Sequence, residues 1–231
     1  MKFRSTQKEL LDNDNIPFED IIVNMDELNV VNTRLGGHAI TLNGIKFFQK
    51  QYPRNTHLSI AEIGCGGGDN LRAIKNFLDG QNVSYTLTGI DIKKECIDYA
   101  IQNAPTPVNW LCSDYRNVVW PENKPDIIFT SLFCHHFTDD ELVAQLQWLR
   151  QNSRLGFFIN DLHRHPLAYY SISIITRLFS RSYLVKNDAP LSVKRGFTAP
   201  EWQQLLKRAG ITNYSLKWKW AFRHLICSIN E

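Results

Sequence analysis

Residues 61–70, Ala61-Glu62-Ile63-Gly64-Cys65-Gly66-Gly67-Gly68-Asp69-Asn70, decide the fold of this chain. An apolar lead precedes the stretch, and leucine, isoleucine and phenylalanine recur at helical spacing over residues 71–78 after it. The pattern predicts a strand, a tight glycine turn and a helix. Glycines at alternate positions let the backbone turn sharply and let a ligand approach without meeting a Cβ atom. The same turn can also be a plain strand-to-helix connection.

Two common nucleotide-binding motifs do not fit this loop. The dinucleotide motif G-x-G-x-x-G requires glycine where Asp69 stands, and a P-loop requires G-K-[ST], which the loop does not contain. The pattern that stands here is acid-x-G-x-G-x-G. It resembles the first motif of the class I S-adenosylmethionine (SAM) dependent methyltransferases, where the acid lies near the ammonium of the methionine moiety. The resemblance implies cofactor contacts by Glu62, Gly64, Cys65, Gly66 and Gly68.

Strands and helices alternate from residue 58 onward. Apolar runs predict further strands over residues 83–90, 107–111, 126–132 and 155–160, with helices between most of them. Such alternation predicts a doubly wound, mostly parallel α/β sheet. Two last strands, near 214–220 and 222–229, are too close in sequence for an intervening helix and must pair antiparallel. This seven-stranded order resembles the Rossmann-like methyltransferase fold over about residues 58–229.

Two regions lie outside the alternation. Residues 1–57 are expected to form an N-terminal helical extension, with a polar, glycine-rich break over residues 30–38. Residues 58–231 are assigned to the SAM-binding domain. Within it, residues 166–197 are expected to form a lid on the substrate side, beginning with an apolar helix over 166–179 and continuing through a polar connection at 187–190.

Composition limits the class of protein. The chain has 231 residues, 43% hydrophobic and 21% charged, which is typical of one globular domain. Its net charge of +3, with mixed signs throughout, gives no field that requires nucleic acid as a partner. Five scattered cysteines favour a reduced, cytoplasmic location. No apolar run reaches the ~18 residues that cross a bilayer. The oligomeric state is left open.

Acids follow the second and third predicted strands. Asp91, with Ile92 beside it, lies where an open α/β sheet presents a carboxylate to a ribose, although it can also cap the next helix. Asp114 matches the adenine-reading position of the family, with Tyr115 placed to cover the ring, although aspartate is also a common turn residue. The resemblance thus implies SAM as cofactor and S-adenosylhomocysteine (SAH) as product.

Histidines follow the fourth and fifth predicted strands, where open sheets place ligands. We predict His136 as the base that removes the acceptor's proton, with His163 as a substitute and Arg164 as an electrostatic assistant. The alternative is a structural histidine that caps or packs on the next helix. No metal site is expected, because His-His and His-x-His on loops are not a recognised ligand spacing and methyl transfer from a sulfonium needs no Lewis acid.

Four segments narrow the resemblance. Residues 32–37, 135–137, 160–165 and 191–197 are similar to bacterial methyltransferases found beside type III polyketide synthases. That resemblance implies O-methylation of a small, apolar aromatic or lipid-like acceptor, in particular a phenol of secondary metabolism. Arg34 is a cation beside the flexible backbone of Gly36 and Gly37, so we expect the break at 32–37 to fold over the methionine end of SAM with Arg34 near its carboxylate. An ordinary helix-ending turn is the alternative for this break.

Two other functions stay open at the level of sequence. A methyltransferase of RNA or protein would show a basic face with interleaved aromatics. Only Lys217-Trp218-Lys219-Trp220 has that composition, and strand alternation predicts its tryptophans on one face and its lysines on the other. A SAM-binding regulator without catalysis is the second alternative. No nucleic-acid partner is expected.

Overall fold

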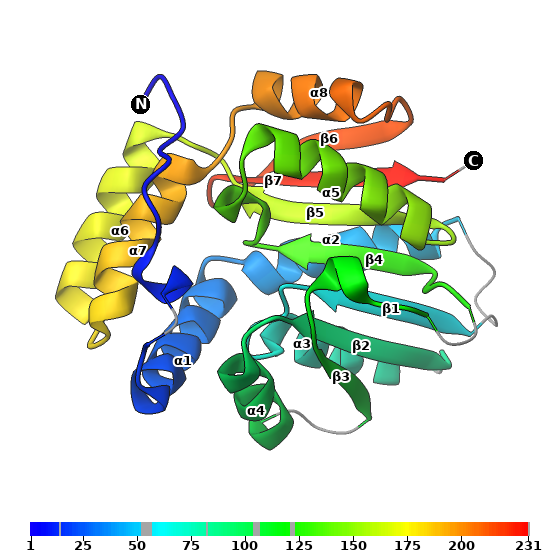
Figure 1. Ribbon diagram of the computed structural model, residues 1–231, viewed down its shortest axis with the longest axis horizontal. Helices are drawn as coiled ribbons and strands as arrows, with labels where there is room; N and C mark the ends of the chain where they lie inside the picture. The colour runs from blue at the N-terminus through cyan, green and yellow to red at the C-terminus, as the bar shows by residue number, and fades with distance from the viewer. Residues whose placement is uncertain (14, 52–56, 82, 104–106, 121–122, 231) are drawn as a thin grey trace.

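A seven-stranded sheet of order β3-β2-β1-β4-β5-β7-β6 forms the centre of the computed structural model, which describes residues 1–13, 15–51, 57–81, 83–103, 107–120 and 123–230 (Figure 1). The strands are β1 (Leu58–Ile63), β2 (Tyr85–Asp91), β3 (Val108–Cys112), β4 (Ile127–Ser131), β5 (Gly156–Leu162), β6 (Tyr214–Lys219) and β7 (Arg223–Ile229). The first five run parallel, and β7 is antiparallel to both β5 and β6. The predicted doubly wound sheet with an antiparallel last pair is therefore confirmed.

Helices cover both faces of the sheet. They are α1 (Phe18–Arg34), α2 (Gly37–Gln49), α3 (Asp69–Asp79), α4 (Lys94–Asn103), α5 (Asp139–Asn152), α6 (Pro166–Phe179), α7 (Tyr183–Arg195) and α8 (Ala199–Arg208), with 3-10 turns η1 (Leu10–Asp12), η2 (Tyr115–Asn117) and η3 (Cys134–His136). Helices α5 and α8 pack on one face around Trp202, which is fully buried. Helices α2 and α3 pack on the other face, where Phe48 and Phe158 are fully buried.

Local sequence sets two of these helix starts. Thr138 donates its backbone N–H to Glu141 Oε2 at 2.8 Å, and Thr198 donates to Glu201 Oε2 at 2.7 Å. Each glutamate stands three residues after its threonine, so both helices begin with a capping box that satisfies otherwise free backbone donors.

The prediction of a polar connection at residues 187–190 is wrong, because these residues belong to α7. Pro190 removes one helical hydrogen bond. The helix persists because Leu184, Val185 and Leu191 are buried on its inner face. Asp188 is buried as well, and its carboxylate accepts from the backbone N–H groups of residues 10 and 11 at 2.8 and 2.9 Å.

The N-terminal region packs against the sheet of the domain. Helix α2 contacts β5 and β7, and its Ile45 and Phe48 belong to the buried core. The glycine-rich break is shorter than expected, since α1 continues to Arg34 and only Gly36 takes a left-handed conformation, with φ of 77°. The assignment of residues 1–57 as an extension stays a prediction, but α2 belongs to the layer that covers the sheet.

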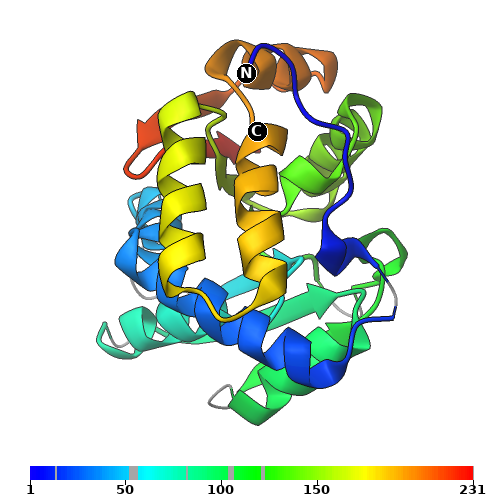
Figure 2. The ribbon, with the colours of Figure 1, turned by 90° about the vertical axis from the view of Figure 1, so that its left-hand side faces the viewer.

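Three helices and the N-terminal segment lie beyond the carboxyl ends of the parallel strands. Helices α6 and α7 stand side by side there, and α1 crosses below their ends (Figure 2). Residues 1–12 run along α7 toward η3, where Arg4 donates to the carbonyl of Phe137 at 2.9 Å and Arg195 donates to that of Gln7 at 2.7 Å. In the part of the chain that is described, no helix is long and apolar enough to cross a membrane.

Candidate functional site

A cavity of about 700 Å³ lies at the carboxyl ends of the parallel strands. The glycine loop and the ends of β2 and β4 form its floor, and α1, α6 and α7 form its walls. Most of the residues predicted to contact a cofactor line it: Glu62, Gly64, Cys65, Gly66, Asp91, Ile92, Asp114 and Tyr115. Gly68 does not line the cavity but begins α3 as its N-cap.

Gly66 is the point at which the loop opens toward the cavity. Its φ is 49°, and a Cβ atom built on it would find only Met25 Sδ, at 3.6 Å. A Cβ on Gly64 would instead lie 2.2 Å from the ring of Phe133, so Gly64 is required for packing. The two glycines thus have different roles. Gly66 leaves space for a ligand, and Gly64 lets the loop pack against the residue that follows β4.

Glu62 brings a buried carboxyl group to the cavity. It is 1% exposed, its Oε1 accepts from Asn70 Nδ2 at 2.9 Å, and its Oε2 has no hydrogen-bond partner among the described residues. Burial, followed by the nearby acids Asp69 and Asp91, raises the pKa of Glu62 well above its usual range. An unpartnered buried carboxyl oxygen fits an ammonium group as its ligand.

Binding of a cationic amine at Glu62 should release a proton. Because the pKa of Glu62 is raised in the free protein and an ammonium partner favours the carboxylate, affinity for SAM should fall as the pH drops through that raised pKa. Calorimetry in buffers of different ionisation enthalpy measures the proton release directly. Glu62→Gln should bind more weakly and release no proton; equal proton release by this variant would contradict the assignment.

Asp91 and Asp114 are held by neighbouring groups. Asp91 accepts from the backbone N–H of Gly66 and of Lys93, both at 2.9 Å, which fixes the glycine loop to the end of β2. Burial raises the pKa of Asp91 despite these bonds. Asp114 caps η2 and pairs with the Arg116 guanidinium, which lowers the pKa of Asp114. Both carboxylates line the cavity at the ends of β2 and β3, where the sequence predicts them. Each also stabilises the turn in which it lies.

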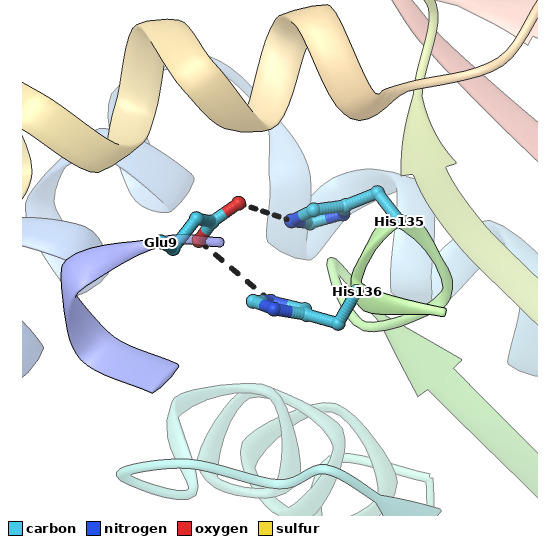
Figure 3. Close-up of side chains that lie close together, drawn as sticks. All are labelled: Glu9, His135 and His136. Atoms are coloured by element: carbon cyan, nitrogen blue, oxygen red, sulfur yellow. Dashed lines mark ion pairs between the residues drawn. The ribbon is translucent and has the colours of Figure 1, made fainter. Parts of the chain in front are cut away.

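A cluster of two histidines and three carboxylates lies at η3, just beyond the end of β4, and Glu9, Asp12, His135 and His136 of this cluster line the cavity. Figure 3 shows Glu9 with its two oxygens directed toward different imidazoles: Oε1 lies 3.5 Å from His135 Nε2, and Oε2 lies 3.8 Å from His136 Nε2. The other nitrogen of each ring meets a second carboxylate. His135 Nδ1 is 2.8 Å from Asp161 Oδ1, and His136 Nδ1 is 3.0 Å from Asp12 Oδ1.

The two histidines differ in burial. Burial alone lowers the pKa of His135, but the carboxylates of Asp161 and Glu9 outweigh it and raise that pKa to about 9. His135 is thus a buried cation between two anions. His136 keeps 23% of its side chain exposed and faces the cavity. Of the two, His136 is the ring that can exchange a proton with a bound molecule.

The donor atoms of Glu9, His135 and His136 lie within 4.8 Å of one another, a spacing that one cation can span. A metal would need an unprotonated nitrogen from each ring. The carboxylates of Asp161 and Glu9, which raise the pKa of His135, favour its doubly protonated ring, which donates from Nδ1 to Asp161 at 2.8 Å and places Nε2 3.5 Å from Glu9. The charges of the cluster are therefore satisfied internally, as an ion-pair network.

His163 and Arg164 do not line the cavity. The prediction that they lie beside the acceptor is therefore wrong. Strand β5 ends at Leu162, and the chain then turns outward to pair with Phe197. Arg164 is buried and donates to the carbonyl of Gly196 and to Glu201 Oε1, both at 2.7 Å, which secures the start of α8. His163 Nδ1 accepts from the indole of Trp218 at 3.1 Å.

Arg34 is also outside the cavity, and Arg223 stands there instead. Asn32, two residues before Arg34 on α1, is buried and donates to Asp69, so Arg34 lies on the opposite, exposed face of the helix. Arg223, at the start of β7, is 3% exposed and lines the cavity. Its Nη2 donates to Asn32 Oδ1 at 2.9 Å, while its Nη1 has no partner among the described residues.

Comparison with protein families identifies a methyltransferase domain over residues 60–156. These residues contain the glycine loop, both aspartates and the paired histidines. No curated protein matches the sequence of the chain.

Solved structures share the fold at low sequence identity. The plantazolicin methyltransferase BpumL in complex with SAH aligns over 93% of this chain and 96% of its own, with a TM-score of 0.69 and 17% identity. Magnesium protoporphyrin IX methyltransferase from Synechocystis PCC 6803 with bound SAH aligns over 95% and 90%, with a TM-score of 0.58 and 14% identity. Human N-acetylserotonin methyltransferase in complex with SAM aligns over 93% of this chain and 56% of its own, with a TM-score of 0.64 and 16% identity.

Proposed function

We propose that this protein is a SAM-dependent methyltransferase that methylates the hydroxyl group of a small, apolar aromatic acceptor, with His136 as the general base. One observation carries the proposal: a single cavity is lined by the glycine loop, by Asp91 and Asp114, and by a half-buried histidine of η3. The methyltransferase domain match over residues 60–156 and the SAM- or SAH-bound structures that share the fold support the choice of cofactor.

The residues on the floor of the cavity fit the chemical groups of SAM. The unpartnered Oε2 of Glu62 suits the ammonium, and the Gly66 backbone leaves space for the ligand. Asp91 keeps acceptor capacity for ribose hydroxyls after its two backbone bonds, since a carboxylate offers about four lone-pair sites. Asp114 and Tyr115 stand at the next strand end, where the adenine would lie.

Arg223 replaces Arg34 in our proposal as the partner of the methionine carboxylate. Its free Nη1 is a buried cationic donor, and burial lowers the pKa of Arg223 to about 10. Asn32 joins Arg223 to Asp69 of the glycine loop, which places this cation on the same side of the cavity as Glu62 and Asn70. A zwitterionic amino-acid group then meets an acid and a base of matching charge.

Arg223→Met should weaken SAM binding by about 1.5–3 kcal/mol, the scale of a hydrogen bond to a charged group. Calorimetric titration with SAM measures the change. Arg34→Met is the matched control, because Arg34 is exposed and does not line the cavity. If the two variants bind SAM equally well, Arg223 is not the carboxylate partner.

Apolar side chains surround the space beyond His136. They come from three helices and the β6–β7 turn: Leu28 and Val31 of α1, Ala168 and Ile172 of α6, Val185 and Val193 of α7, and Phe222. A largely apolar pocket with a few polar groups at one end selects a flat, apolar molecule that carries one hydroxyl. This arrangement supports a phenol, including one with a hydrocarbon tail, as the acceptor.

The chemistry follows from how His136 is held. Asp12 accepts from Nδ1, which leaves Nε2, 3.8 Å from Glu9 Oε2, as the nitrogen that takes the proton of the acceptor hydroxyl. SAM supplies an electrophilic methyl group on its sulfonium. The deprotonated oxygen forms the new bond to the methyl carbon while the carbon–sulfur bond breaks, and the electron pair of that bond stays on sulfur, giving SAH. Alignment of the oxygen with the methyl group supplies much of the rate.

An acceptor panel tests the substrate class. Parent protein and SAM are incubated with alkylated phenols, with the matching phenyl methyl ethers, and with peptide and RNA pools, and SAH release is measured. We expect turnover with the phenols and none with the ethers, which have no hydroxyl proton to remove. Turnover of peptide or RNA alone would replace the proposed acceptor with a macromolecule.

A further inference from the structure

Helix α6 presents an apolar face to solvent. Residues 167, 170, 174, 175 and 178 recur at helical spacing on that face and are leucine, tyrosine or isoleucine. Leu167 is 58% exposed, Ile174 59% and Leu178 70%, and Phe179 at the end of the helix is 79% exposed. One such residue on a surface needs no explanation, but a continuous apolar stripe along four turns of helix marks a contact surface.

The opposite sides of α6 face two different environments. Ala168, Ile172 and Ile175 line the cavity of the proposed active site. Tyr169, Ser173 and Arg177 line a separate groove of about 210 Å³ between α6 and α7. Around the helix, the exposed apolar stripe lies between these two sets. Figure 2 shows α6 and α7 as two antiparallel helices that stand side by side on this side of the molecule.

The groove between α6 and α7 is basic. Arg177, Lys186 and Lys194 line it, and no acidic side chain does. The Lys194 ammonium lies 4.5 Å from the centre of the Tyr169 ring. Arg181 is exposed just beyond the end of α6. Cations beside an exposed apolar stripe are complementary to the headgroups and acyl chains of an anionic lipid surface.

The β6–β7 turn extends the same surface to the mouth of the cavity. Trp220 is 69% exposed and also lines the cavity. Phe222 stacks on His165 with ring centres 5.1 Å apart, and His165 caps the start of α6. Trp218 precedes this turn and is exposed. Tryptophan is typical of segments that lie at the boundary between lipid and water.

We propose that the outer face of α6, with the α6–α7 groove and the β6–β7 turn, docks on the surface of an anionic lipid bilayer, so that the acceptor enters the cavity from the membrane past Ile175 and Trp220. This inference rests on the proposed function for the nature of the acceptor. The docking itself depends only on the surface. Apolar residues enter the headgroup region, and Arg177, Lys186 and Lys194 bind anionic headgroups, without any segment crossing the bilayer.

Vesicle sedimentation tests the docking independently of catalysis. Full-length protein is mixed with phosphatidylcholine vesicles that contain or lack phosphatidylglycerol, at about 0.1 M salt. We expect binding to the anionic vesicles that weakens as salt is added. L167Q/I174Q/L178Q should lower the partition coefficient by about tenfold or more, and R177E/K186E should abolish the preference for phosphatidylglycerol. Glutamine keeps a high helix propensity, so α6 should persist in the triple variant.

A control variant and an activity assay separate this inference from the proposed function. V119S/K50E changes an exposed valine and an exposed lysine on other elements and should bind vesicles like the parent. The triple variant should methylate a water-soluble phenol at the parent rate but a vesicle-embedded phenol more slowly. Equal vesicle binding by parent and triple variant would overturn the proposal. A parent that ignores vesicles but forms a dimer that the triple variant disrupts would also overturn it, and would make this face an interface between two copies.

Discussion

His136→Gln should lower turnover of a phenolic acceptor by about 100- to 10,000-fold, the contribution of a general base, while leaving SAM affinity unchanged. Glutamine keeps a polar side chain on η3 but cannot take a proton at neutral pH. The polar contacts of His136 are with Asp12 and Glu9 and not with Glu62, Asp91 or the glycine loop, so its loss should not disturb the floor of the cavity. Steady-state kinetics and calorimetry on the same preparation measure the two effects.

The pH dependence of this variant separates catalysis from packing. A general base acts only in its unprotonated form, so a rate that falls on the acidic side of the parent's pH–rate profile is the signature of such a base. That acidic limb should disappear in His136→Gln. Asp12→Asn weakens the bond at 3.0 Å that orients the ring and should give an intermediate loss of turnover with the limb retained. A His136→Gln enzyme that works at the parent rate would show that the residue is structural.

Gly66→Val should weaken SAM binding more than 100-fold. The φ of Gly66 is 49°, a region that a β-branched residue strongly disfavours, at about 1–2 kcal/mol for a residue with a Cβ. The added side chain would also extend into the space that the ligand needs, since only Met25 Sδ stands near the Cβ position. Strain and steric exclusion act in the same direction, so the combined effect is large. Calorimetric titration with SAM measures it.

Gly80→Ala is the matched control for that experiment. Gly80 follows α3 with φ of −72°, and an added Cβ would meet only the carbonyl oxygens of Phe77 and Asn76 at 3.8 and 4.0 Å. This variant should bind SAM like the parent. Thermal unfolding of both variants shows whether the domain remains folded. Parent-like SAM affinity in a folded Gly66→Val protein would place the cofactor elsewhere.

Local patterns made the sheet and the floor of the cavity predictable. A glycine loop, an acid after β2 and an acid after β3 are each set by a few neighbouring residues, and parallel strands bring their carboxyl ends to one edge. The helix over 166–179 was predictable for the same reason. The parallel direction of five strands followed from the alternation of strands and helices, and the antiparallel last pair followed from the short connection between them.

Contacts between distant segments were not predictable. Glu9 and Asp12 reach His135 and His136 across more than 120 positions of the chain, and nothing in the pattern of residues 1–12 indicates this pairing. Arg223 lies beyond the β6–β7 turn and enters the cavity only because β7 lies beside β5. The sequence points to Arg34 instead, because that residue stands beside Gly36 and Gly37 in an expected break. Helix α1 continues to Arg34 and puts its side chain on the exposed face.

Transfer of a labelled methyl group tests the central claim most directly. Parent protein is mixed in excess with SAM carrying a carbon-13 methyl group and with an alkylated phenol, and both products are followed in a single turnover. We predict a carbon-13 methoxy group on the phenol and one SAH for each methyl transferred, with His136→Gln forming both products at least about 100-fold more slowly. Protein that binds no SAM, or that binds SAM without labelling any phenol, would contradict the account.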